Sequence, residues 1–183
     1  MRCELIAILM FAVMPVAKAQ TAGNAFVGYS FEDVSSSTAG IVNGNRIVLN
    51  GWNASGEVKV YRWLGLVGDV SVRYGSGRQS FPGIFFTYDA HEHELLFGPR
   101  ASVSFGRIRP FGEVLFGWDF THLDGGGPCC LSNSSFAAAV GGGADYRVTK
   151  VFALRAEGDY IYTDLHSMGQ NNLRLSTGMV ARF

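Results

Sequence analysis

Apolar and polar residues alternate with a period of two along most of this chain. The clearest example is the stretch from Asn171 to Phe183, which has an apolar face and a polar face. The apolar face carries Leu173, Leu175, Thr177, Met179, Ala181 and Phe183, and the other face carries Arg174, Ser176, Gly178, Val180 and Arg182. This period predicts a β-strand, because a helix would repeat its apolar residues every three or four positions.

Seven earlier segments show the same alternation, which predicts eight strands in total. The segments lie at about 25–31, 51–61, 65–74, 93–105, 110–120, 135–146 and 151–163. Longer loops are expected at 34–46, 75–89, 123–134 and 164–170, after the first, third, fifth and seventh strands. Tight turns follow the other strands, one of them at 106–108. Alternating long and short connections are typical of a transmembrane β-barrel with short periplasmic turns.

The first residues, 1–19, have the pattern of a cleaved export signal. Arg2 precedes an apolar stretch from Leu5 to Val16, and Ala17-Lys18-Ala19 forms a small-x-small cleavage site. Residues 20–183 then form one domain, which we expect in the bacterial outer membrane. No segment of that domain approaches the length of apolar sequence that a spanning helix needs.

Charge is sparse and balanced, which argues against nucleic acid as a partner. Without Arg2, Lys18 and Glu4, the 15 basic and 15 acidic residues become 13 and 14. Charged residues make up 16% of the chain, whereas about a quarter is typical of soluble proteins. Glycine is abundant at 24 residues, and aromatic residues reach 13%. This composition suits either a soluble all-β protein or a membrane barrel.

Three features favour the membrane barrel over a soluble, lipocalin-like ligand-binding barrel. Small residues lie between the charges on the polar face, as a narrow lumen requires. The chain ends on an aromatic residue of the apolar face. Aromatic residues also stand near the strand ends, as in the interfacial girdles of membrane barrels; they are Tyr29, Trp52, Tyr74, Phe105, Trp118, Tyr146, Tyr160 and Phe183.

Charges of both signs share the polar face, which predicts an ion-pair network inside the barrel. An eight-stranded barrel is just wide enough to be filled by side chains, so we expect a plugged lumen, with a narrow pore as the alternative. The predicted network comprises Glu57, Lys59, Asp69, Arg73, Glu94, Arg100, Glu113, Asp145, Arg155, Glu157 and Arg174.

Several stretches resemble bacterial outer-membrane β-barrel-domain proteins of the OmpA-like and opacity-protein type. They are LNGWNASGEVKVYRWLGLVGD from Leu49 to Asp69, HELLFGPRASVSF, and GDYIYT followed by NNLRLSTGMVARF. Ser176, Gly178 and Phe183 match the spacing of the closing-strand signal of such barrels, whereas Ala181 departs from it. The resemblance implies the eight-stranded fold, its outer-membrane location and insertion by the barrel-assembly machinery. We expect no peptidoglycan-binding domain.

Other candidate chemistry is weaker. Cys129 and Cys130 are adjacent in the third long loop, where they could form a local disulfide or an intermolecular link in the oxidising exterior. His91 and His93 share a strand face and could contact one metal ion, but two ligands make a poor site. Asp164, His166 and Ser167 do not have the spacing of lipid-trimming barrel enzymes. We therefore predict no catalytic, metal or cofactor site.

The sequence predicts an all-β, eight-stranded, antiparallel up-and-down transmembrane barrel. The expected function is structural or surface-interacting, in a monomer that contacts outer-membrane lipid and whose surface ligand is unknown. The alternatives are a narrow porin-like channel and, less favoured, a lipid-modifying enzyme or a soluble ligand binder.

Overall fold

The computed structural model describes residues 22–34, 47–81, 84–125, 131–165 and 168–183, and these residues form eight strands. No helix in these ranges is long and apolar enough to cross a membrane. The strands are β1 (Gly23–Val34), β2 (Ile47–Lys59), β3 (Leu64–Phe81), β4 (Ile84–Ser102), β5 (Ile108–Gly125), β6 (Leu131–Arg147), β7 (Phe152–Leu165) and β8 (Met168–Arg182).

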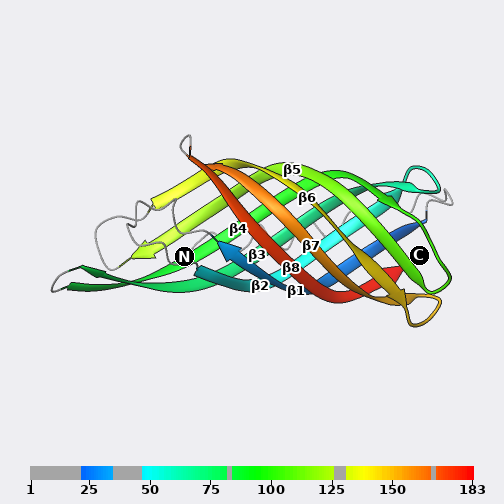
Figure 1. Ribbon diagram of the computed structural model, residues 1–183, viewed down its shortest axis with the longest axis horizontal. Helices are drawn as coiled ribbons and strands as arrows, with labels where there is room; N and C mark the ends of the chain where they lie inside the picture. Colours follow the sequence, from blue (N-terminus) through cyan, green and yellow to red (C-terminus); the bar gives the residue numbers. More distant parts are fainter. Residues whose placement is uncertain (1–21, 35–46, 82–83, 126–130, 166–167) are drawn as a thin grey trace, which may run out of the picture.

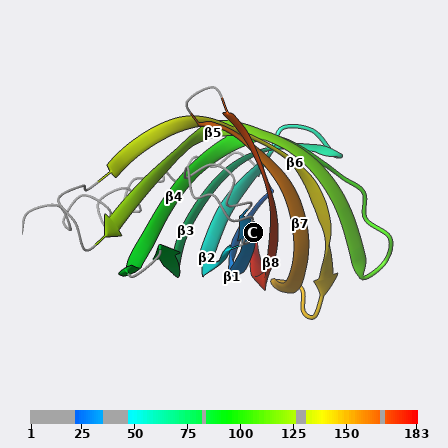
Figure 2. The same ribbon diagram turned by 60° about the vertical axis from the view of Figure 1, so that its left-hand side comes forward.

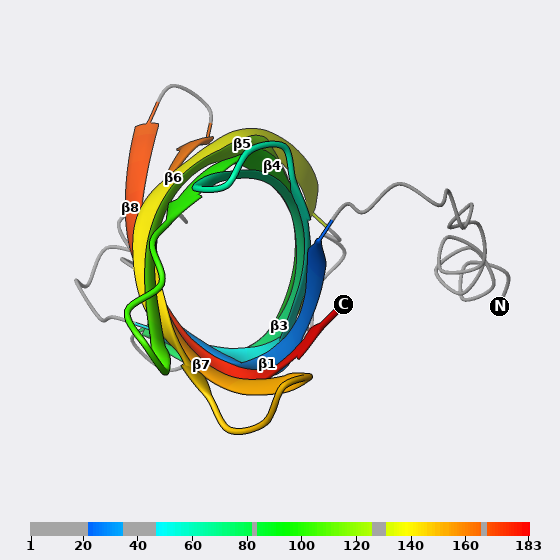
Figure 3. The same ribbon diagram turned by 90° about the vertical axis from the view of Figure 1, so that its right-hand side faces the viewer.

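The strands close into an up-and-down antiparallel barrel, as the alternating pattern predicts (Figure 1). Each strand pairs with its sequence neighbours, and β1 pairs with β8, with Tyr29 opposite Thr177. The view along the barrel shows a complete ring of strands (Figure 3). Closure leaves no free sheet edge, so every strand can satisfy its backbone hydrogen bonds within the bilayer.

The strands at the outer end are longer than the sequence pattern predicts. The stretch 75–89 was expected to be a loop, but β3 and β4 continue through it, and their register runs on to the pair Phe81 and Ile84. This hairpin projects beyond the ends of the other strands in Figure 1, and Figure 2 turns the same end of the barrel toward the viewer. The third and fourth outer connections also contain strand, because β5 reaches Gly125 and β7 reaches Leu165. Glycine and polar residues interrupt the alternating pattern there, so the sequence did not predict these extensions.

The turn between β4 and β5 begins earlier than expected. The fourth strand was predicted to reach Phe105, but β4 ends at Ser102. Phe105 and Ile108 bracket the turn and exchange backbone hydrogen bonds of 2.8 and 3.0 Å. Between them Gly106 has a φ of 60°. Glycine adopts this left-handed conformation without the steric penalty of a side chain, and it therefore sets the position of the turn.

The outward face is apolar, as the alternation predicts. All eight aromatic residues expected at the strand ends are exposed, from 46% for Trp52 to 70% for Phe183. Val72 differs, because it is only 7% exposed, whereas Val70 and Tyr74 on the same face of β3 are 41% and 49% exposed. In register it lies between Trp52 and His93, whose larger side chains flank it.

The barrel interior contains apolar residues as well as charges. One cluster joins Val67, Leu96, Leu115, Ala137, Ala139 and Ile161, and a smaller one joins Phe26, Ala153 and Val180. The sequence analysis assigned a mainly polar interior, and of these residues it named only Val180 on the polar face. They are inward because they share strand parity with the buried charges. Residues 1–19, Cys129 and Cys130 lie outside the described residues.

Candidate functional site in the lumen

The predicted network residues all lie on the inward face of the barrel. Ten of the eleven are buried, and the exception, Lys59, has a side chain that is 16% exposed. Their inward direction follows from the period of two, because successive side chains of a strand point to opposite faces. The structure brings them together in ion pairs that can be followed from one end of the lumen to the other.

Arg73 is the centre of the pairs nearest the outer end. Its guanidinium lies 2.5 Å from Glu32, 3.1 Å from Glu92 and 2.8 Å from Glu94. These acids come from β1 and β4, so one arginine links three strands. Its side chain is fully buried, which makes the pairing necessary, because an isolated charge in such a place would be costly.

Arg174 connects the walls at the middle of the lumen. Its Nη2 lies 2.8 Å from Asp159 on the neighbouring β7. Its Nη1 lies 2.9 Å from Asp69 on β3 and 3.2 Å from Glu94 on β4, and neither strand is adjacent to β8. Asn53 also donates hydrogen bonds of 2.8 and 3.0 Å to the carboxylate of Asp69. These contacts span the lumen.

Two further arginines occupy the next level toward the periplasmic turns. Arg155 Nε donates a 2.7 Å hydrogen bond to Asp145, and Arg100 Nε donates a 2.7 Å bond to Glu113. Both guanidinium groups lie against the ring of Phe111, at 4.7 and 4.4 Å from its centroid. The aromatic ring fills space between two cations that would otherwise repel, and its face attracts both of them.

Glu57 organises the charges at the periplasmic end. It lies 2.6 Å from Lys59 and 3.0 Å from Arg109, and it accepts a 3.0 Å hydrogen bond from Asn24. Arg109 and Lys59 both also donate to the hydroxyl of Ser102, at 2.9 and 2.6 Å. With Arg100 at 3.9 Å as a third partner, one acid here pairs with three cations, whereas near the outer end one cation pairs with three acids.

Small residues on β6 make room for the long side chains. Between Ser135 and Asp145, the inward positions of β6 hold only alanine and glycine. A β-carbon at Gly141 would collide with Asp159, and one at Gly143 would crowd Glu157. The lumen of an eight-stranded barrel is therefore filled by pairing long charged residues with small neighbours.

Sequence reasoning missed five members of the network: Glu32, Glu92, Arg109, Asp119 and Asp159. Strand parity could have identified most of them, because Glu92 shares its face with Glu94, and Asp159 with Glu157. Glu32 and Arg109 lay at or beyond the ends of the predicted strands. They were omitted because the predicted strands, 25–31 and 110–120, were shorter than β1 and β5.

The two weaker candidate sites gain no support. His91 and His93 share an outward-directed face, as expected, but the described residues contain no group of three or more His, Cys, Asp or Glu that could hold a metal ion. His91 instead packs edge-on against Tyr74, with ring centroids 5.2 Å apart. The candidate hydrolase residues His166 and Ser167 lie outside the described residues.

The closed ring, the apolar exterior and the charged interior together define a transmembrane outer-membrane β-barrel. The family model for the outer membrane protein beta-barrel domain matches residues 4–183. The chain belongs to this family, and its location is the bacterial outer membrane. No curated protein sequence matches the chain significantly.

Solved structures of small outer-membrane barrels share the fold. Ail, the attachment invasion locus protein of Yersinia pestis, is 16% identical, with a TM-score of 0.60, over 88% of this chain and 99% of that one. Neisserial surface protein A is 16% identical, with a TM-score of 0.62, over 88% and 99%. OprG from Pseudomonas aeruginosa is 9% identical, with a TM-score of 0.59, over 89% and 96%.

Proposed function

We propose that this protein is a closed, non-enzymatic barrel that acts at the outer surface of the cell and not by transport through its lumen. The observation that carries the proposal is the contact of Arg174 with acids on β3, β4 and β7. A lumen crossed by buried ion pairs leaves the outer connections as the parts that are free to bind.

The hairpin of β3 and β4 is the best candidate for the interacting element. It continues for seven residue pairs beyond Tyr74 and His91, and its backbone groups are already paired. Its sequence includes Phe81, Phe85 and Phe86. Aromatic residues are enriched at protein interfaces, which suits a contact with another macromolecule. The similar barrel Ail is an attachment protein whose structure contains a heparin analogue, and this likeness of fold supports a surface role by analogy.

We propose further that the protein is a monomer in outer-membrane lipid. The closed barrel leaves no unpaired strand that could extend the sheet into a second copy. Insertion would depend on the barrel-assembly machinery, which would recognise the closing strand with Ser176, Gly178 and Phe183.

Shortening the hairpin tests the surface role. Residues 76–89 would be replaced by an Asn-Gly turn, which joins the paired residues Gly75 and Ala90 without altering the rest of the barrel. Cells producing the native protein should adhere to epithelial monolayers or polystyrene more strongly than cells without it, and this variant should abolish the difference. A hairpin of native length with Phe85→Ser and Phe86→Ser tests the aromatic residues alone. Heat-modifiable gel mobility confirms that each variant is folded.

Equal adherence by cells producing the native and the shortened barrel would remove this hairpin from the proposed role.

A narrow channel is the second candidate, and one observation favours it. Some buried polar atoms of the described lumen have no hydrogen-bond partner, including Asp119 Oδ1 and Glu32 Oε1. Such groups can hold water, and connected water could conduct ions. Steady single-channel current would favour this function.

A further inference from the structure

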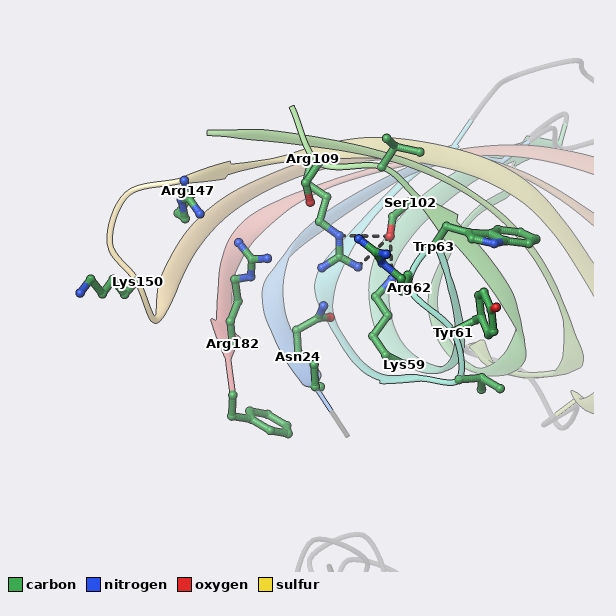
Figure 4. A pocket seen from close by; sticks show the side chains of 16 residues that line it. Asn24, Lys59, Tyr61, Arg62, Trp63, Ser102, Arg109, Arg147, Lys150 and Arg182 are labelled. Atoms are coloured by element: carbon green, nitrogen blue, oxygen red, sulfur yellow. Dashed lines mark hydrogen bonds between the residues drawn. The ribbon is translucent and has the colours of Figure 1, made fainter. Parts of the chain in front are cut away.

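The lumen network does not fill the periplasmic mouth of the barrel, which contains a cavity of about 990 Å³ (Figure 4). Its walls come from the starts of β1 and β5, the ends of β2, β4, β6 and β8, and the turns that follow β2, β4 and β6. This volume lies at the upper end of the range of small-molecule sites. The cavity could therefore hold a group much larger than a water molecule.

The wall of this cavity is strongly basic, and we call it the basic vestibule. None of the described residues that line it is Asp or Glu. All charged side chains among the described lining residues are therefore cations. The cations that define the vestibule are Lys59, Arg62, Arg109, Arg147, Lys150 and Arg182.

Nearby acids do not neutralise this charge. Glu57, beneath the vestibule, is already shared by Lys59 and Arg109 at 2.6 and 3.0 Å. Arg62, Lys150 and Arg182 form no ion pair with any acid in the described part of the chain. Cations confined together without counter-charges repel one another, and a bound anion relieves that repulsion.

Ser102 adds a neutral donor at the base of the vestibule. Its hydroxyl oxygen accepts hydrogen bonds from Lys59 Nζ at 2.6 Å and from Arg109 at 2.9 and 3.1 Å. A serine hydroxyl that accepts from cations keeps its own proton free to donate. Arg109 is only 7% exposed, so its guanidinium is held in place by these contacts. Figure 4 shows Arg109, Ser102, Lys59, Arg182 and Asn24 around the same opening.

Aromatic residues place the vestibule at the level of lipid headgroups. Tyr61, Trp63 and Phe183 line the same cavity, and their exposures are 64%, 53% and 70%. Tyrosine and tryptophan concentrate at the membrane–water interface of barrels, beside the phosphates of the lipids. The mouth therefore opens where phosphate groups are abundant.

We propose that the basic vestibule binds a phosphate group from the periplasmic side. Guanidinium groups match phosphate oxygens in charge and in the geometry of their donors, and several arginines here can act together. The phosphate could belong to the headgroup of an anionic phospholipid of the periplasmic leaflet or to a soluble phosphate. In both cases, a phosphate group next to Ser102 would accept hydrogen bonds from several cationic side chains.

Tryptophan fluorescence of the folded full-length barrel tests this proposal. Trp52→Phe and Trp118→Phe leave Trp63, on the vestibule wall, as the only tryptophan. In one arm, pyrophosphate is titrated into barrels held in phosphatidylcholine nanodiscs. In the other arm, phosphatidylglycerol replaces part of the phosphatidylcholine. The same measurements are made with Arg62→Gln and Arg182→Gln, and with Arg107→Gln as the control, because Arg107 is an exposed turn cation outside the vestibule.

The proposal predicts a saturable change in Trp63 emission in at least one arm. Each vestibule variant should weaken the binding affinity obtained from this change roughly three- to fivefold, whereas Arg107→Gln should leave the affinity unchanged. A response to pyrophosphate alone identifies a soluble phosphate, and a response to phosphatidylglycerol alone identifies a lipid. No response in either arm, or equal binding by native and vestibule variants, would overturn the proposal. Arg62 is exposed in a turn, so its variant can be compared without loss of folding.

Discussion

Arg174 on β8 places its Nη1 2.9 Å from Oδ1 of Asp69 on β3, although β1 and β2 separate these strands around the barrel. The two side chains are 0% and 1% exposed. Backbone pairing cannot bring them together, because neither strand touches the other. The two side chains meet because both point inward and the lumen between them is narrow.

This contact shows that side chains from different walls meet inside the lumen. The same arginine also contacts Glu94 and Asp159, so it joins residues from three walls. Buried charges that are paired in this way resist separation, because each would be left without compensation. Side chains thus cross the lumen and also hold its walls together.

Removing one buried cation should destabilise the barrel strongly. Arg155→Ala leaves Asp145 without its 2.7 Å partner and removes the cation packed against Phe26 and Phe111. Breaking a buried pair in this way costs about 3–5 kcal/mol. Urea unfolding of the barrel in lipid vesicles measures the change in the free energy of unfolding.

Arg107→Ala serves as the control for this prediction, because Arg107 is exposed in the turn between β4 and β5. Its removal should change the free energy of unfolding by less than about 0.5 kcal/mol. If Arg155→Ala and Arg107→Ala unfold at the same urea concentration, the lumen charges do not stabilise the barrel as described.

The two faces of one strand should respond differently to substitution. Leu175 is the middle residue of β8 and is 53% exposed on the outer face, whereas its neighbour Ser176 is 4% exposed on the inner face. Leu175→Arg places a charge near the bilayer midplane and should cost about 2–4 kcal/mol. Ser176→Ala removes a buried hydroxyl that has no partner and should cost much less. Equilibrium folding into lipid vesicles measures the loss of stability in each variant. Equal losses would contradict the assignment of Leu175 to the outer face and Ser176 to the inner face.

Phe183→Ala tests the proposed closing-strand signal. The ring is 70% exposed, and the residue also exchanges backbone hydrogen bonds with Gly23 that do not depend on the ring. The substitution should therefore lower insertion in cells, where the assembly machinery acts, more than refolding into detergent. Cell fractionation and heat-modifiable mobility measure both. Unchanged cellular insertion would reduce Phe183 to a packing residue.

The number, order and facing of the strands could be predicted because they depend on local alternation. A one-residue shift would turn every side chain of a strand to the wrong face, so the pattern is unambiguous where apolar and charged residues alternate. The strand ends were less accessible to prediction. Glycine and polar residues in 75–89 are compatible with a loop, and only pairing between β3 and β4 shows that they continue the sheet.

The composition of the network was predictable, but its pairings were not. Parity places Arg174 and Asp69 on the inner face, yet nothing local indicates that they meet across the lumen. Their contact depends on barrel closure and on the register of several strands together. The basic vestibule was missed for a related reason. Its cations come from separate turns and strand ends that adjoin only after the barrel closes.

Planar-bilayer recording of the native barrel tests the closed lumen most directly. A lumen crossed by the contacts of Arg174 should show at most rare, small openings. Arg174→Ala should increase their frequency, because it removes the link between β8 and the acids of β3 and β4. Steady, ion-selective conductance from the native protein would contradict the closed-barrel account and favour a small channel.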